Sequence, residues 1–240
     1  MEKLLAAILL TALFNPSLHA ESQASDYQSS YEKFMQQRST EKSPLSEQDM
    51  AIMKKASQQL QQQLPNPGIQ VGEQAPDFIL SNAFGKKVEL SEELKKGPVV
   101  LVFYRGAWCP FCNMYLHALQ DNLPGFEQYG ARLITITPQT PDKSAEQIEK
   151  DSYPFEVLSD LDNQVMQDYK LYFRIPDDLV AVYKKIGLDI ESYNGEGRNE
   201  LPVPGTFVID RQGVVRAMHA DTDYKKRMEP AAIIEALKAL

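Results

Sequence analysis

Two cysteines separated by two residues are the part of this sequence best suited to chemistry. Cys109 and Cys112 are the only cysteines among the 240 residues. They follow an apolar run at 98–103, which predicts a buried strand that delivers both sulfurs to the start of a helix. At this spacing the two thiols can close a small disulfide ring, and a helix N-terminus stabilises a thiolate at the first of them. The pattern predicts a redox site in which Cys109 is the nucleophile.

The residues next to the cysteines supply a charge and an apolar wall. Arg105 precedes Cys109 by four residues and adds a cation, and Trp108 adds the wall. We expect Cys109 to be exposed, with a pKa below the ordinary thiol value of about 8.5, and Cys112, one turn inside the helix, to titrate at or above that value. The alternative cations are two more distant arginines, Arg216 and Arg227.

Two other interpretations of the cysteine pair are half of a zinc site and an inert structural disulfide. A zinc ion needs about four ligands. Beyond the two thiols the chain offers only His19, His117 and His219. We therefore expect neither a metal ion nor a cofactor in this site.

The first twenty residues have the pattern of a secretory signal peptide. Lys3 precedes an apolar stretch at 4–14 that is too short to span a bilayer, and the break at Asn15-Pro16 leads to a small residue, Ala20. The alternatives are a membrane anchor and a cytosolic helix. Removal of residues 1–20 predicts a periplasmic or secreted protein without membrane insertion, in an oxidising compartment where a partner must keep a catalytic disulfide reduced.

Composition excludes some partners. The net charge is −8 and the pI is near 5.0, whereas nucleic acids and anionic membranes bind clustered Lys and Arg. We therefore expect no nucleic-acid partner. The apolar fraction of 43% is enough for a hydrophobic core.

Residues 21–69 read as a polar, partly helical extension. Ser46 and Asp49 have the spacing of a capping box, which predicts a helix over 46–63, and Pro65 to Gly68 end it. This extension is expected to pack on the main domain, pair with a second copy in a homodimer, or stay partly mobile. It shows no residues of catalytic type.

From residue 70 to 240 strands and helices alternate. Strands are predicted at 75–80, 87–90, 99–104, 133–137, 155–158, 205–210 and 214–219, and helices at 91–95, 109–128, 143–150, 163–169 and 230–240. This order predicts an α/β fold, a three-layer sandwich with a central mixed β-sheet and helices on both faces. The cysteines then lie at the carboxyl end of a central strand, where such sheets place their sites.

Several segments of this domain resemble one family. The string Phe-Tyr-Arg-Gly-x-Trp-Cys-Pro-x-Cys at 103–112, together with 72–80, 88–91 and 204–210, is similar to the peroxiredoxins of the alkyl hydroperoxide reductase and thiol-specific antioxidant family. The resemblance covers about 70–240 and implies a thioredoxin-like fold. One departure is clear, because Gly106 stands three residues before Cys109, where the family has Thr or Ser, and Phe103 stands where it has Pro.

The same resemblance assigns neighbours to the cysteine pair. Pro204 matches the cis-proline that faces the cysteines in thioredoxin-like folds, although an ordinary trans proline at a strand edge is the alternative. The residues expected beside the substrate are Trp108, Pro110, Phe111, Val203 and Pro204.

Three functions are compatible with this sequence. The first is a thiol peroxidase that reduces hydrogen peroxide or organic hydroperoxides through Cys109, with Cys112 as the resolving thiol and a thioredoxin-like protein as reductant. The second is a thiol:disulfide oxidoreductase that acts on protein disulfides with little peroxidase activity. The third is a binding module whose disulfide is only structural. The family segments favour the first, and Trp-Cys-Pro-x-Cys with the absent threonine favours the second.

Overall fold

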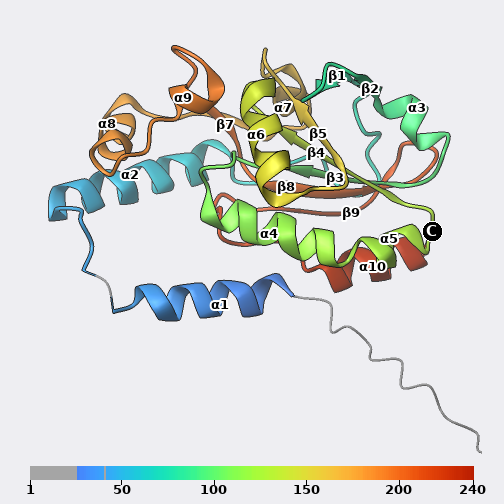
Figure 1. The fold of residues 1–240 in the computed structure, drawn as a ribbon, viewed down its shortest axis with the longest axis horizontal. Coiled ribbons are helices and arrows are strands. Elements are labelled where there is room, and N and C mark those ends of the chain that lie inside the picture. Colours follow the sequence, from blue (N-terminus) through green and yellow to red (C-terminus); the bar gives the residue numbers. More distant parts are fainter. Residues whose placement is uncertain (1–25, 41) are drawn as a thin grey trace, which may run out of the picture.

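A mixed sheet of seven strands forms the centre of the molecule (Figure 1). The computed structural model describes residues 26–40 and 42–240, so the predicted signal peptide at 1–20 lies outside the described residues. The strands lie in the order β2-β1-β5-β4-β3-β8-β9. Their bounds are β1 Ile79–Asn82, β2 Lys87–Glu89, β3 Val99–Phe103, β4 Arg132–Thr137, β5 Glu156–Ser159, β8 Gly205–Ile209 and β9 Val215–Ala220.

Strand β3 lies inside this sheet, between β4 and β8, and every one of its side chains is apolar. All five residues are buried, and the strand is parallel to β4 and antiparallel to β8. Continuous apolar runs suit strands that are covered on both faces. The register pairs Phe103 with Gly205, so that the residues following β3 lie beside those preceding β8. The segment that carries the two cysteines starts at this edge of the sheet.

Helices cover both faces of the sheet, which confirms the predicted sandwich. One face packs on α4 (Pro110–Asp121) and α10 (Pro230–Lys238), through Leu116, Leu119 and Ile233. The other face packs on α7 (Gln164–Asp168) and on neighbouring loops, through Val165 and Met166. The remaining helices of the domain are α3 Leu90–Leu94, α5 Leu123–Glu127, α6 Pro141–Asp151, α8 Asp177–Lys185 and α9 Glu191–Asn194.

The single helix predicted over 109–128 is wrong, because the chain breaks at Asn122. This residue leaves the helical conformation with ψ near 2° and separates α4 from α5. Pro124 explains the break, since a proline is tolerated only in the first turn of a helix and here starts α5. The helix expected at 91–95 begins one residue earlier, with Glu89 as its N-cap.

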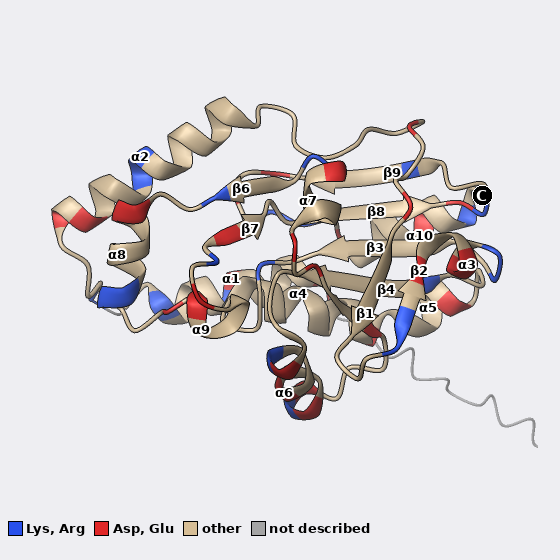
Figure 2. Ribbon diagram, turned by 90° about the horizontal axis from the view of Figure 1, so that it is seen from above, with Lys and Arg blue, Asp and Glu red and all other residues tan. Residues whose placement is uncertain are grey.

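The segment 172–202 contains elements that sequence patterns did not indicate. Strands β6 (Tyr172–Arg174) and β7 (Glu200–Pro202) form a separate two-stranded sheet, with α8 and α9 between them in the chain. Figure 2 shows this small sheet between the main sheet and the pair α2 and α8. Strands of three residues are too short to show an alternating pattern.

The extension forms two helices, α1 (Tyr27–Arg38) and α2 (Glu47–Gln63). Helix α2 confirms the predicted capping box, since Ser46 Oγ accepts from the N–H of Asp49 at 3.1 Å and the Asp49 carboxylate accepts from the N–H of Ser46 at 3.2 Å. Helix α2 packs on α8, and α1 packs on α4. Within the described residues, no helix has the length and apolar character needed to cross a membrane.

Candidate active site

The two sulfurs lie together at the start of α4. Cys109 is the N-cap of this helix and Pro110 its first residue, so the turn that ends β3 leads directly into the helix. The Sγ atoms of Cys109 and Cys112 are 2.9 Å apart and not bonded to each other, and each cysteine is only 1% exposed. The pair confirms the predicted strand–helix placement. The expected exposure of Cys109 is wrong, because helices and loops distant in the sequence cover it.

The charge of the pair is distributed opposite to the sequence-based expectation. Burial, and then the contact with Cys112, raise the pKa of Cys109. Burial also opposes a charge on Cys112, but the hydrogen bond with Cys109 and the guanidinium groups of Arg227 and Arg105 outweigh it and lower the pKa of Cys112 to about 6. The prediction that Cys109 would titrate below Cys112 is therefore wrong. The two thiols titrate as one coupled pair whose first negative charge is stabilised at Cys112.

Arg227 is the cation closest to this charge. Its Nη2 lies 3.5 Å from the Sγ of Cys112, and its Nη1 donates to the carbonyl oxygens of Tyr224 and Lys226. The guanidinium also lies 5.8 Å from the ring centre of Tyr115 on α4. These contacts hold Arg227 over Cys112. The cation beside Cys112 is therefore Arg227, one of the two alternatives considered from the sequence.

Arg105 is buried on the other side of the pair. It is 5% exposed, and its guanidinium lies between the rings of Trp108 and Tyr224, with centroid distances of 4.7 and 4.3 Å. Its Nη2 donates to the hydroxyl of Tyr183 at 3.3 Å. Burial opposes the charge, but Tyr183 and Cys109 favour it and raise the pKa of Arg105 above its ordinary value. Arg105 therefore stays positive beside the thiols.

Buried amides that the sequence did not indicate hold the loop between β3 and α4. The side-chain oxygen of Gln139 accepts from the N–H of Ala107 at 3.0 Å, and Asn113 Nδ2 donates to the carbonyl of Ala107 at 2.7 Å. Gln147 joins the two groups, because it donates to Asn113 at 3.1 Å and accepts from Gln139 at 3.1 Å. Gln139 and Gln147 come from the end of β4 and from α6, so no local signal links them to the cysteines.

Gly106 has a conformation that other residues rarely adopt. Its φ is +143°, and a Cβ there would lie 2.6 Å from Nε1 of Trp108 and 3.3 Å from the side-chain oxygen of Gln139. This geometry explains why the family's Thr or Ser is absent from this chain, since a β-branched residue would be strained and would displace Trp108.

We expect Gly106→Ala to lower the free energy of unfolding by about 1–3 kcal/mol, because it combines backbone strain with a steric clash. Urea unfolding followed by Trp108 fluorescence measures the change. The matched control is Gly72→Ala, at φ +89° with no heavy atom within 4 Å of the added carbon, which isolates the backbone contribution. Equal losses in the two variants would show that Trp108 and Gln139 do not constrain Gly106.

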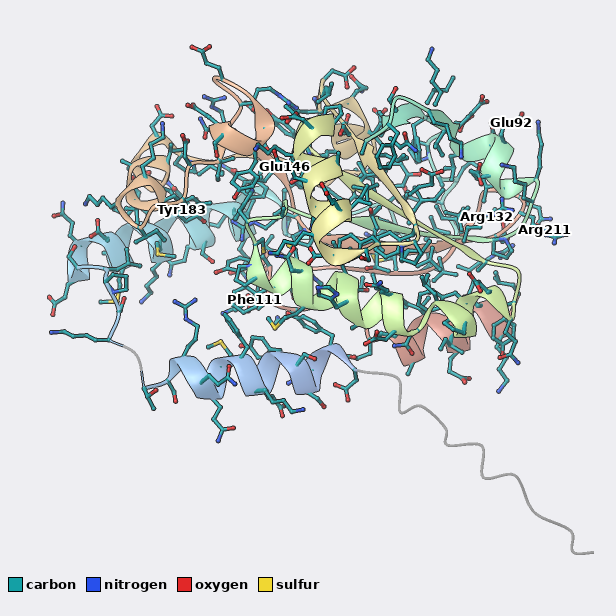
Figure 3. The ribbon with its side chains drawn as sticks, in the orientation of Figure 1. Glu92, Phe111, Arg132, Glu146, Tyr183 and Arg211 are labelled. Carbon is teal, nitrogen blue, oxygen red and sulfur yellow. The ribbon has the colours of Figure 1, made fainter. Side chains whose placement is uncertain are left out.

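An aromatic cluster from three parts of the chain covers the pair. Phe111 points from the start of α4 toward α1 (Figure 3). Its ring centre lies 6.0 Å from Tyr31 and 5.5 Å from Phe34, both on α1, and 5.5 Å from Tyr224. Pro110 is exposed and Trp108 half-buried. Of the neighbours expected from the sequence, Phe111 and Trp108 thus pack around the thiols and the arginine.

The segment Val203-Pro204 lies beside the end of β3, as the register of β8 requires. Pro204 and Arg105 line the same cavity. The predicted cis conformation is wrong, because no peptide bond in the described ranges is cis.

The other candidates have structural roles. His117 is half-exposed and lies 3.6 Å from Asp151 on α6, away from the sulfurs. The carboxylate of Asp160, which the spacing of Asp160 and Asp162 could suggest as a cation ligand, accepts from the N–H of Met166 at 2.8 Å at the start of α7. Among the residues that the structure describes, no group of three His, Cys, Asp or Glu side chains is placed to bind a metal ion.

Two thiols that share a buried site at a strand–helix junction, between two arginines, define a thiol-dependent oxidoreductase of thioredoxin fold. Comparison with known proteins identifies the family. The model of the AhpC/TSA family matches residues 71–218, and the chain belongs to this family. The resemblance noted in the sequence, to peroxiredoxin-like proteins, is therefore confirmed.

Individual relatives agree with this assignment. The chain is 32% identical over 172 residues to the chloroplastic peroxiredoxin Q of Suaeda salsa, which covers 70% of this chain and 66% of that protein. It is 36% identical over 107 residues to a putative peroxiredoxin bcp of Haemophilus influenzae, covering 45% and 68%. The chain thus spans about two thirds of the length of these relatives.

Solved structures show the same fold. The peroxidoxin BcpB of Mycobacterium tuberculosis superposes with a TM-score of 0.57 at 22% identity, covering 72% of this chain and 98% of that one. Peroxiredoxin Q of Xanthomonas campestris gives a TM-score of 0.51 at 18% identity, covering 68% and 90%. The matched family region leaves out α1 and α2, which belong to this chain's own extension.

Proposed function

We propose that this protein is a thiol peroxidase that reduces a hydroperoxide with the pair Cys109 and Cys112. The observation that carries the proposal is the pair itself, with sulfurs 2.9 Å apart between Arg105 and Arg227 in a chain of the AhpC/TSA family. A thiolate, cations for the charge that develops on oxygen, and a second thiol are the parts that peroxide reduction needs.

Cys109 attacks the peroxide in this proposal, because Arg105 acts on it more strongly than Arg227 does, and Arg105 lines a cavity. Because the pKa of Cys112 is lowered and that of Cys109 is raised, a proton passes from Cys109 to Cys112 across the 2.9 Å contact to place the thiolate at Cys109. Its sulfur bonds to the distal oxygen, the O–O bond breaks, and the leaving oxygen takes a proton to become water or an alcohol.

Cys112 then resolves the sulfenic acid. Its sulfur attacks the sulfur of Cys109, a disulfide forms, and the hydroxyl leaves as water after taking a proton. Two thiols and one hydroperoxide thus give one disulfide, one water and one further water or alcohol. We propose that a dithiol protein of thioredoxin type returns two electrons and two protons by disulfide exchange.

The experiment that tests this proposal is stopped-flow oxidation of the reduced protein by hydrogen peroxide, followed through Trp108, the only tryptophan in the chain. We expect a rate constant well above that of free cysteine. The Cys112→Ser variant should still react once and accumulate a sulfenic acid, and the Cys109→Ser variant should not react. The reverse result would assign the attack to Cys112, the thiol whose pKa is lowered.

A rate no faster than free cysteine, combined with rapid exchange with protein disulfides, would contradict the peroxidase and support the disulfide oxidoreductase instead. Coupled turnover with a thioredoxin-like donor measures the proposed reductant in the same preparation.

We propose a periplasmic or secreted location, supported by the pattern of residues 1–20. Mass spectrometry of the protein from the source cells tests it, and a mature chain that retains residues 1–20 would contradict it.

A further inference from the structure

An apolar cavity of about 120 Å³ is built partly by the extension. One wall is α2, which contributes Ala56 and Leu60, and the opposite wall includes Ile175 and Leu179 near the start of α8. Tyr183 lies further along α8, where that helix runs beside α2 (Figure 3). Neither cysteine is among the lining residues, so an occupant of this cavity need not react with the thiols.

Arg105 brings a buried cation without a counter-ion to the lining of this cavity. The residue is 5% exposed, and its Nε is buried without a hydrogen-bond partner. Within residues 26–40 and 42–240, its guanidinium donates to the hydroxyl of Tyr183 and forms no ion pair with a carboxylate. A buried charge is costly when no group of opposite sign pairs with it. A negatively charged ligand group is therefore stabilised beside Arg105.

The other polar groups of the lining fit the same ligand. Arg174 also lines the cavity, but it is exposed and its Nη1 already donates to the carboxylate of Glu200. The hydroxyl of Tyr183 accepts from Arg105, so it keeps its own proton to donate to a ligand oxygen. Apolar walls with a few polar groups that fix orientation are typical of small-molecule sites.

We propose that this cavity binds a small carboxylate with a branched apolar group, which pairs with Arg105 and thereby makes the thiol pair less reactive. The inference goes beyond the proposed peroxidase function, because this ligand regulates the thiols and is not consumed. An engineered apolar cavity of about 150 Å³ holds benzene. A cavity of about 120 Å³ therefore fits a smaller group, such as the isobutyl group of 3-methylbutanoate.

Arg105 couples this site to the cysteines. Burial has the largest influence on both thiols, but the charge of Arg105 favours the ionised form of each and so acts to lower the pKa of Cys109 and of Cys112. A carboxylate bound to Arg105 offsets this charge and disfavours the thiolate. Because such coupling is reciprocal, the ligand binds the thiolate form of the protein more weakly than the uncharged form.

Calorimetric titration with three probes tests the site. We expect 3-methylbutanoate to bind the reduced protein at least about 10-fold more tightly than 3-methylbutanamide, which lacks the charge, or acetate, which lacks the apolar group. Arg105→Met should lose the preference for the carboxylate over the amide, and Arg174→Met should keep it. Loss of this preference in Arg174→Met alone would assign the carboxylate to Arg174 and overturn the inference.

Filling the cavity is a second test that leaves Arg105 in place. Ser57 is an exposed residue of α2 that lines the cavity, so Ser57→Phe adds a ring there without removing a buried side chain. We expect this variant to bind 3-methylbutanoate about 10-fold more weakly, in the range that a change in an apolar pocket produces. Gln58→Phe is the matched control, since Gln58 is exposed on the same helix outside the cavity. Equal affinities in the two variants would overturn the inference.

The coupling to the thiols is measured without peroxide, so its outcome does not depend on the proposed function. The pKa of Cys112 is about 6, so a tenfold coupling means that saturating 3-methylbutanoate lowers the thiolate absorbance of the wild-type protein at pH 7 by about half. The double variant Cys109→Ser/Cys112→Ser has no thiolate and should bind the ligand about 5-fold more tightly than the reduced wild-type protein. Unchanged absorbance together with equal affinity would overturn the inference.

Discussion

Replacement of Arg227 with methionine is expected to raise the pKa of the buried thiol pair and to slow its oxidation at neutral pH. The guanidinium lies 3.5 Å from Sγ of Cys112 and contributes to lowering that pKa to about 6. A hydrogen bond to a charged group contributes about 1.5–3 kcal/mol, which corresponds to one to two pKa units and, from a pKa of about 6, to a rate loss of about 2- to 10-fold at pH 7. Ultraviolet absorbance of the thiolate against pH measures the shift.

The sign of the pH dependence makes this prediction specific. Below the pKa of the pair the thiols are protonated, so a raised pKa removes thiolate near neutral pH. The wild-type protein and Arg227→Met should therefore react at the same rate only when the pH exceeds the pKa of the thiol pair in both proteins. Arg216→Met is the control, because Arg216 pairs with Asp210 at 2.5 Å in the structure and has no contact with the sulfurs. An unchanged titration in Arg227→Met would show that this arginine does not stabilise the charge.

Truncation of Tyr27 should expose the thiols. Tyr27 is 2% exposed at the start of α1, its ring lies 5.6 Å from that of Tyr115, and its hydroxyl donates to the carbonyl of Lys225. The N–H groups of Tyr27 and Gln28 donate to the carboxylate of Glu229 at 3.0 Å. Removal of a buried aromatic side chain costs about 3–5 kcal/mol, so Tyr27→Ala should weaken the docking of α1 on α4.

The measurement is the rate of alkylation of the reduced protein by iodoacetamide. Since both cysteines are 1% exposed, iodoacetamide reacts only when the segments that cover them open. We therefore expect the cysteines of Tyr27→Ala to be alkylated about 100-fold faster than those of the wild-type protein. Tyr27→Phe retains the ring and should stay near the wild-type rate. Tyr129→Ala is the matched control, because Tyr129 packs against the same core cluster but belongs to the turn after α5. Alkylation of Tyr27→Ala at the wild-type rate would show that α1 does not cover the thiols.

Local patterns predicted the frame of the site. The apolar run before the cysteines became β3, the pair lies at the start of α4, and Ser46 with Asp49 caps α2, because each of these features depends on residues within a few positions of one another. Because such patterns report only on neighbouring residues, some of the sequence-based predictions were wrong. Short strands such as β6 carry no period, and the break at Asn122 depends on Pro124, which the apolar pattern of 109–128 concealed.

The sequence by itself therefore determined the fold class, the redox pair and its place at the end of a central strand, since apolar periodicity and cysteine spacing are local properties. Only the tertiary structure decided the pKa values of the two thiols and how deeply they are buried. Arg227 lies 115 residues from Cys112, and Tyr27 docks 198 residues from its partner Lys225. Burial and the electric field of distant side chains set a thiol pKa, and both arise only when these segments come together.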